Sequence, residues 1–135
     1  FMTKLQKYKK EYAKELLKIA EGDFETTKVL YNAKAGRKEN ICFIAQQVVE
    51  KSIKAVLCHL ELPIPHTHNL DILMDKLPDK YQTLEADGYN ELTEYETIRR
   101  YENGNFELDS DDLRQAFAVA EKFLLWAKSI VEDFR

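Results

Sequence analysis

The chain has 135 residues, of which 44% are hydrophobic and 33% charged, with only four glycines and three prolines. This composition excludes a disordered or collagen-like protein, and we expect one domain covering residues 1–135. No stretch approaches the roughly 20 apolar residues that a membrane-spanning helix needs, so we expect no contact with a membrane.

The net charge of −4 conceals two unequal segments. Residues 1–20 carry six lysines against two glutamates, whereas residues 79–112 carry eleven acidic side chains against three basic ones. Such charge runs most often mark solvated helix faces, and the alternative is an electrostatic docking surface.

The first predicted helix covers residues 4–34, where apolar side chains recur at steps of three and four. Gly22 lies inside this helix, where a kink or a close helix contact would account for a glycine, and Gly36 is expected to end it. The expected buried stripe consists of Tyr12, Leu16, Ala20, Phe24, Thr27 and Tyr31.

The second predicted helix, over residues 40–61, is the most apolar segment and should be covered on more than one side. Pro63 and Pro65 are expected to end it. Cys42 and Cys58 would lie about 24 Å apart along its axis, too far for a disulfide. Two unpaired cysteines favour a cytoplasmic protein.

The pattern of apolar residues predicts further helices in the rest of the chain. A short helix runs from Leu70 to Pro78, and a tyrosine-bearing stretch over 80–101 supplies a further helix. After a loop over 102–109, Asp109 or Ser110 caps a last helix that runs to about residue 134. Short connections make neighbouring helices antiparallel, so the expected fold is an all-α, up-and-down four-helix bundle with an additional short helix.

Cys58, His59, His66 and His68 form one candidate site, because thiolates and imidazoles are zinc ligands. However, their spacing matches no recurrent zinc pattern, and the adjacent Cys58 and His59 point apart on a helix. We therefore expect no metal ligands and no cofactor, with Cys58 in the core and the last two histidines ordering the loop.

Arg99, Arg100 and Tyr101 form a second candidate, because two guanidiniums beside a phenol can bind phosphate and stack on a base. The alternative for these arginines is ordinary ion pairing with Glu94, Glu96 or Glu102.

Gln46 and Gln47, with Glu50 and Lys51, are polar side chains in the middle of the apolar helix. They are either satisfied by internal hydrogen bonds or face a cleft or a partner. No catalytic triad, glycine-rich phosphate loop or nucleophile elbow is present, so we name no catalytic residue.

The segment Ala-Gln-Gln-x-x-Glu-Lys-x-x-Lys-Ala over residues 45–55, followed by Thr-His-Asn-Leu over 67–70, resembles the HEPN domain family (higher eukaryotes and prokaryotes nucleotide-binding). The resemblance extends from about residue 12 to 132, and Arg100-Tyr101 matches the family's later Arg-Tyr pair. It implies a small helical domain, usually a homodimer, often paired with a minimal nucleotidyltransferase in a toxin–antitoxin-like system.

Many family members are metal-independent ribonucleases that use an arginine and a histidine four to six residues later. Here no histidine follows His68, and the acidic surroundings of Arg99 and Arg100 oppose RNA as a substrate. We therefore expect a non-catalytic or nucleotide-binding dimer in which Arg99, Arg100 and Tyr101 contact the nucleotide, with Glu50 and Lys51 lining the same cleft. The alternative is a ribonuclease toxin with a degenerate motif, in which His66 or His68 acts as a remote base.

Overall fold

The computed structural model describes residues 1–82 and 108–132, and all its regular elements are helical. They are α1 (Lys4–Ala33), α2 (Lys38–His59), α3 (Leu70–Asp75), the 3-10 turn η1 (Asp79–Tyr81) and α5 (Ser110–Val131). The predicted all-α bundle is confirmed. The expected helix over residues 80–101 lies outside the described residues, apart from its first few.

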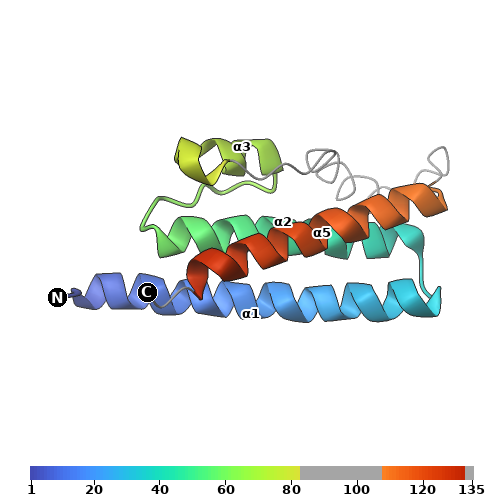
Figure 1. The fold of residues 1–135 in the computed structure, drawn as a ribbon, viewed down its shortest axis with the longest axis horizontal. Helices are drawn as coiled ribbons and strands as arrows, with labels where there is room; N and C mark the ends of the chain where they lie inside the picture. The colour runs from blue at the N-terminus through green and yellow to red at the C-terminus, as the bar shows by residue number, and fades with distance from the viewer. Residues whose placement is uncertain (83–107, 133–135) are drawn as a thin grey trace.

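Helix α2 lies at the centre of the bundle, as its apolar sequence predicts (Figure 1). It runs antiparallel to α1, and α5 packs against both while running in the same direction as α2. Helix α3 covers a third side of α2. The core is therefore built around one helix that is enclosed by three others.

Helix α1 begins with a capping box, in which Thr3 and Gln6 each accept a hydrogen bond from the other's backbone N–H. It ends at Ala33, where Lys34 takes the left-handed conformation at φ 54°, and Gly36 follows with a second positive φ of 84°. The predicted buried stripe needs correction at both ends, because Tyr31 is only partly buried and Tyr12 is exposed. Tyr12 is 43% exposed, because Ala13 faces the core and the side chain of Tyr12 points about 100° away from that of Ala13 around the helix.

Helix α2 starts two residues earlier than predicted and ends at His59 rather than near residue 61. It stops there because Glu61 adopts the left-handed region at φ 62° and Pro63 follows. Its buried side chains include Val49, Ile53 and Leu57. None of the helices in the described ranges is long and apolar enough to cross a membrane.

Helix α5 also begins with a capping box, because Asp109 and Asp112 accept hydrogen bonds from each other's backbone N–H. The predicted cap at Asp109 is therefore confirmed, but the helix ends at Val131 instead of near residue 134. Phe123 is fully buried, and Phe117 stacks on Tyr31 of α1 with 4.6 Å between ring centroids. This aromatic contact holds the start of α5 against the end of α1.

Gly22 produces neither of the features that sequence analysis suggested. Helix α1 continues through it without interruption, and a Cβ placed there would have no heavy atom within 4 Å. Within a single chain the glycine therefore weakens the helix, because it leaves the unfolded chain more freedom than alanine would.

We expect Gly22→Ala to raise the free energy of unfolding by about 0.5–1 kcal/mol, measured by urea denaturation. Gly36→Ala is the matched control and should lower it, because Gly36 has φ 84°, which alanine adopts only with strain. A less stable Gly22→Ala variant would contradict the absence of a close contact at this position.

Candidate functional site

The carboxylate of Glu50 is the centre of a polar network on α2. Glu50 is 6% exposed, and its Oε2 accepts a hydrogen bond from Lys54 Nζ at 2.9 Å. Its Oε1 accepts one from Gln46 Nε2 at 3.1 Å and lies 2.9 Å from Nδ1 of His68. Because Gln46, Glu50 and Lys54 are four residues apart, they share one face of the helix. The predicted internal hydrogen bonding of Gln46 is therefore confirmed.

The loop that precedes α3 brings His68 to this network. Asn69 caps α3 by accepting a hydrogen bond from the N–H of Ile72, and its own N–H donates to Thr67 Oγ1. Gln46 Nε2 also donates to the backbone oxygen of His68 at 3.3 Å. The Thr-His-Asn-Leu motif therefore closes the loop onto α2, and the motif residues of the two segments meet in space.

The hydrogen bonds around Glu50 change the acidity of its carboxyl group. Burial alone would raise the pKa, but the hydrogen bonds from Lys54, His68 and Gln46, together with the charge of Lys54, outweigh burial and lower it. Glu50 is therefore a carboxylate at neutral pH. Such a group can hold an imidazole in a fixed orientation.

Lys51 lies on another side of α2 and contacts a different element. Its Nζ donates to Asp23 Oδ2 of α1 at 2.6 Å, and both side chains are about one-quarter exposed. Glu50 instead contacts the loop before α3. Among the described residues, Glu50 and Lys51 therefore contact different elements, because consecutive residues on a helix point about 100° apart. A common cleft that involves Arg99, Arg100 and Tyr101 stays a prediction.

The predicted arginine pair and Tyr101 lie outside the described residues, so their position relative to Glu50 stays a prediction. The four candidate metal ligands are all described, and they do not converge. Cys58 Sγ donates to the backbone oxygen of Lys9 at 3.2 Å, while His68 turns to Glu50. Within residues 1–82 and 108–132, no three His, Cys, Asp or Glu side chains are grouped as a metal ion would require.

The two cysteines are free and buried, as the predicted distance between them implies. Burial, assisted by the charges of Asp112 and Glu39, raises the pKa of Cys42 to about 12. Burial also raises the pKa of Cys58. Both thiols therefore stay protonated at neutral pH and are poor nucleophiles.

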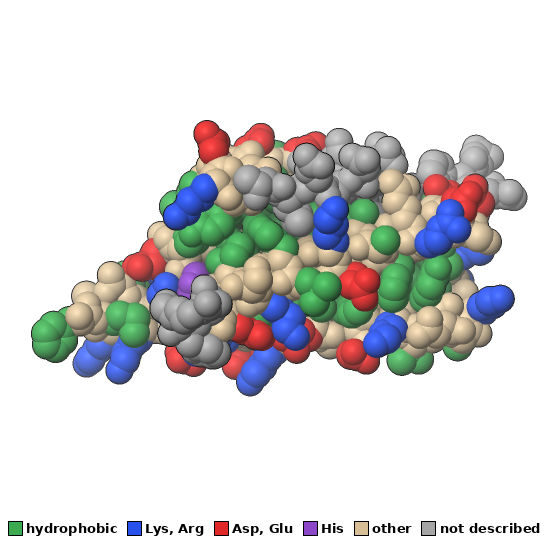
Figure 2. Space-filling model, in the orientation of Figure 1, with side chains coloured by type: hydrophobic (Ala, Val, Ile, Leu, Met, Phe, Trp, Pro, Cys, Tyr) green, Lys and Arg blue, Asp and Glu red, His purple; other side chains and the backbone are tan. Residues whose placement is uncertain are grey.

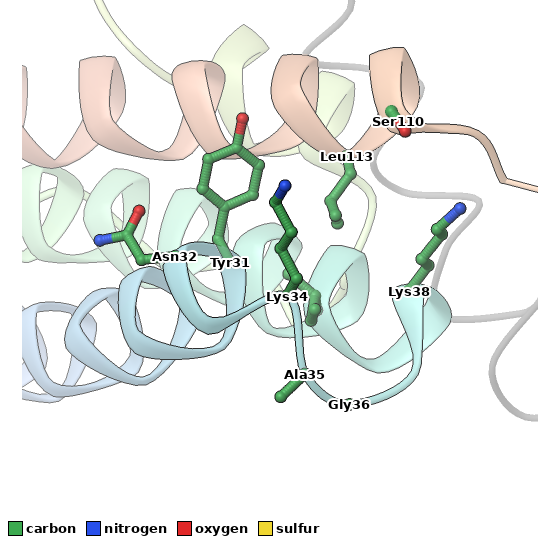
Figure 3. A pocket seen from close by; sticks show the side chains of 9 residues that line it. Tyr31, Asn32, Lys34, Ala35, Gly36, Lys38, Ser110 and Leu113 are labelled. Atoms are coloured by element: carbon green, nitrogen blue, oxygen red, sulfur yellow. The ribbon is translucent and has the colours of Figure 1, made fainter.

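A cleft of about 500 Å³ lies where the α1–α2 turn meets the start of α5 (Figure 3). Tyr31 and Lys34 point from the end of α1 toward α5, and Leu113 points back from α5 into the cleft. Lys38, at the start of α2, donates to the backbone oxygen of Leu108 at 3.4 Å. The full lining consists of Tyr31, Asn32, Lys34, Ala35, Gly36, Lys38, Ile41, Ser110 and Leu113.

This cleft combines two ammonium groups with an aromatic ring, a set that suits an anionic ligand with a planar group. Of the described acids nearby, Asp109 and Asp112 cap α5, Asp111 pairs with Arg114, and Glu39 pairs with Arg37. The cleft is not apparent from the amino-acid sequence alone. Its only signal was the basic character of the turn around Gly36, since the contribution of α5 comes from residues far along the chain.

The family model for the HEPN domain matches residues 13–130, so the chain belongs to the HEPN domain family, a group of nucleotide-binding and ribonuclease-type domains. Comparison with curated protein sequences and with solved structures gave no significant match. The match includes both motif segments that form the network around Glu50.

We expect Glu50→Gln to lower the free energy of unfolding by about 1–3 kcal/mol at neutral pH, because Lys54 and His68 lose a buried charged partner. The pKa of Glu50 is lower in the folded protein than its ordinary value of 4.5. The stability that ionised Glu50 gives the folded protein is therefore fully present above pH 4.5. It disappears as the pH falls through the lowered pKa of Glu50 in the folded protein.

The measurement is urea denaturation of wild type and variant between about pH 7 and pH 3, where the two stabilities should converge toward the acidic end. Glu121→Gln, at an exposed position on α5, is the control and should follow wild type throughout. A Glu50→Gln deficit that does not shrink with acidity would show that its ionisation is not the source of the stability.

Proposed function

We propose that this chain is a non-catalytic, nucleotide-binding HEPN domain that forms a homodimer and partners a nucleotidyltransferase-type protein in a toxin–antitoxin-like pair. Family membership supports nucleotide binding as the class of function. The observation that carries the proposal is the cleft with Lys34, Lys38 and Tyr31, because its size of about 500 Å³ is typical of small-ligand sites.

In this proposal the lysines neutralise the phosphates, and Tyr31 offers a ring to the base. Arg99, Arg100 and Tyr101 supply further ligand contacts. The hydrogen bond from Lys38 to Leu108 supports their participation, because it joins a lysine of the cleft to a residue that follows the segment carrying them. Glu50 and Lys51 then act through the ion pairs that stabilise the bundle.

The acidic excess over residues 79–112 supports a small nucleotide and a protein partner over RNA. Polyanionic RNA would bring many phosphates close to these carboxylates, whereas a mononucleotide brings few. The nucleotidyltransferase partner is testable by co-expression with the product of the neighbouring gene and co-purification through a tag on one chain. Failure to co-purify would contradict the partnership and leave nucleotide binding unaffected.

Isothermal titration calorimetry with ATP, GTP and a nucleoside monophosphate should detect binding to the wild-type protein. Lys34→Ala combined with Lys38→Ala should weaken it at least tenfold, since two charge-assisted phosphate contacts are lost. The double variant of Arg99 and Arg100 to alanine tests the second set of contacts. Lys76→Ala, an exposed lysine far from the cleft in sequence, is the control.

Absence of binding to wild type would refute the nucleotide part of the proposal. Binding that is lost only in the arginine variant would place the site at Arg99 and Arg100 and remove the cleft from it.

A metal-independent ribonuclease is the second candidate function, and the Glu50–His68 pair favours it. A buried carboxylate holds the Nδ1 of a histidine whose side chain is 62% exposed, which is how an imidazole is oriented for proton transfer. Cleavage would also require an arginine near His68 to stabilise charge on the phosphate.

We expect no cleavage of tRNA or mRNA by the purified protein, because no histidine follows Arg99 or Arg100 at the spacing that the family's ribonucleases use. The assay compares wild type with His68→Ala and Arg100→Ala on denaturing gels. Cleavage that both substitutions abolish would replace the non-catalytic proposal with the ribonuclease.

A further inference from the structure

The outward face of α1 carries five large apolar side chains that no described element covers. Their exposed fractions are 43–64%, although side chains of these types are usually buried. They are Leu5, Tyr8, Tyr12, Ile19 and Val29. We call this set the α1 outer stripe.

The α1 outer stripe follows one continuous heptad register. Leu5, Tyr8 and Tyr12 are separated by three and four residues, and the same alternation continues through Ile19 to Val29. The intervening positions of the register are Glu15, Gly22 and Thr26, all exposed. A seam of this kind is the side of a helix that another helix packs against.

The core-facing side chains of α1, such as Leu17 and Phe24, lie on the other side of the helix. The stripe is therefore additional to the surface that holds the bundle together. At its start the Tyr8 and Tyr12 rings stack with an interplanar angle of 4° and 6.2 Å between centroids. Hydrophobic and lysine side chains cover this projecting end of the molecule (Figure 2).

The charges along the stripe indicate what covers it. Lys4, Glu11, Lys18 and Glu25 follow one edge of the stripe at seven-residue intervals, so their signs alternate along the helix. Lysines dominate residues 1–20, whereas Glu21, Asp23 and Glu25 outnumber Lys28 in the remainder of the helix. A helix that complements this pattern has its acidic end beside the basic end of α1.

The α1 helix of a second copy meets this requirement when the two helices run antiparallel. We propose that the α1 outer stripe, over its span from Leu5 to Gly22, is a homodimer interface formed by two antiparallel α1 helices. Val29 lies beyond the overlap of the two helices. Tyr8 of each copy packs on Ile19 of the other, and Leu5 packs over Gly22, where the structure leaves open space. In this register Lys4 faces Glu25 of the other copy and Glu11 faces Lys18, so the charged row is complementary.

A parallel pairing of the same stripe is less favourable. It would place the lysine-rich first halves of both helices side by side and leave the acidic residues facing each other. The antiparallel arrangement also satisfies the twofold symmetry that most homodimers have. The inference depends on the homodimer in the proposed function and not on nucleotide binding.

Size-exclusion chromatography with light scattering tests the interface on the full chain. Wild type should have the mass of a dimer, and Tyr8→Glu combined with Ile19→Glu should halve it. Leu125→Glu is the matched control, because Leu125 is 60% exposed on α5 and should leave the dimer intact. Circular dichroism verifies that both variants keep the wild-type helix content.

The outcomes separate the two proposals. A wild-type monomer at high concentration would refute the homodimer itself. A dimer that survives the Tyr8 and Ile19 substitutions would keep the homodimer and refute this interface. A dimer lost only in the Leu125 variant would move the interface to α5.

Thiol crosslinking tests the direction of the helices. Tyr8→Cys and Ile19→Cys proteins, mixed and treated with a short bifunctional maleimide, should form a crosslinked dimer, whereas neither should crosslink alone. In the antiparallel register identical residues lie about 16 Å apart along the axis, since eleven residues separate the two positions. Crosslinking of either variant alone would overturn the antiparallel arrangement, and wild type controls for the buried native cysteines.

Discussion

The buried carboxylate of Glu50 is the interaction on which the arrangement of this domain depends. A charged side chain on a helix that is covered on several sides must be paired. Burying it without a partner would lower the free energy of unfolding by several kcal/mol. Lys54 and Gln46 supply partners from the same helix, but His68 comes from the loop after it. The contact between Glu50 and His68 therefore ties the loop after α2 to that helix and contributes to the placement of α3.

Much of the fold follows from sequence because its causes are local. The apolar character of residues 41–57 predicts the central helix, and Asp109 predicts the start of α5 through its own capping hydrogen bond. The wrong predictions occur where tertiary packing determines which side of a helix is buried. Tyr12 fits a buried helical stripe by spacing alone, yet it faces outward because the adjacent Ala13 is the residue buried in the core.

The candidate site was less accessible from sequence for the same reason. Glu50 and Lys51 are neighbours in a motif, but helix geometry sends one to the α3 loop and the other to Asp23 of α1. The cleft near Gly36 joins residues from three helices, and the hydrogen bond from Lys38 to Leu108 joins residues 70 positions apart. No local pattern encodes such a contact, whereas the family motifs were visible because each is short and contiguous.

The length of α1 has a consequence for how the domain unfolds locally. Lys10 Nζ binds the backbone oxygen of His59, the last residue of α2, so the turns of α1 before Lys9 extend beyond the end of that helix. Residues in such an extension lack the packing that protects the rest of the core, and they can fray independently of it. The fraction of time that this basic end is helical can therefore change without unfolding of the core. It should rise when a partner covers the surface beside it.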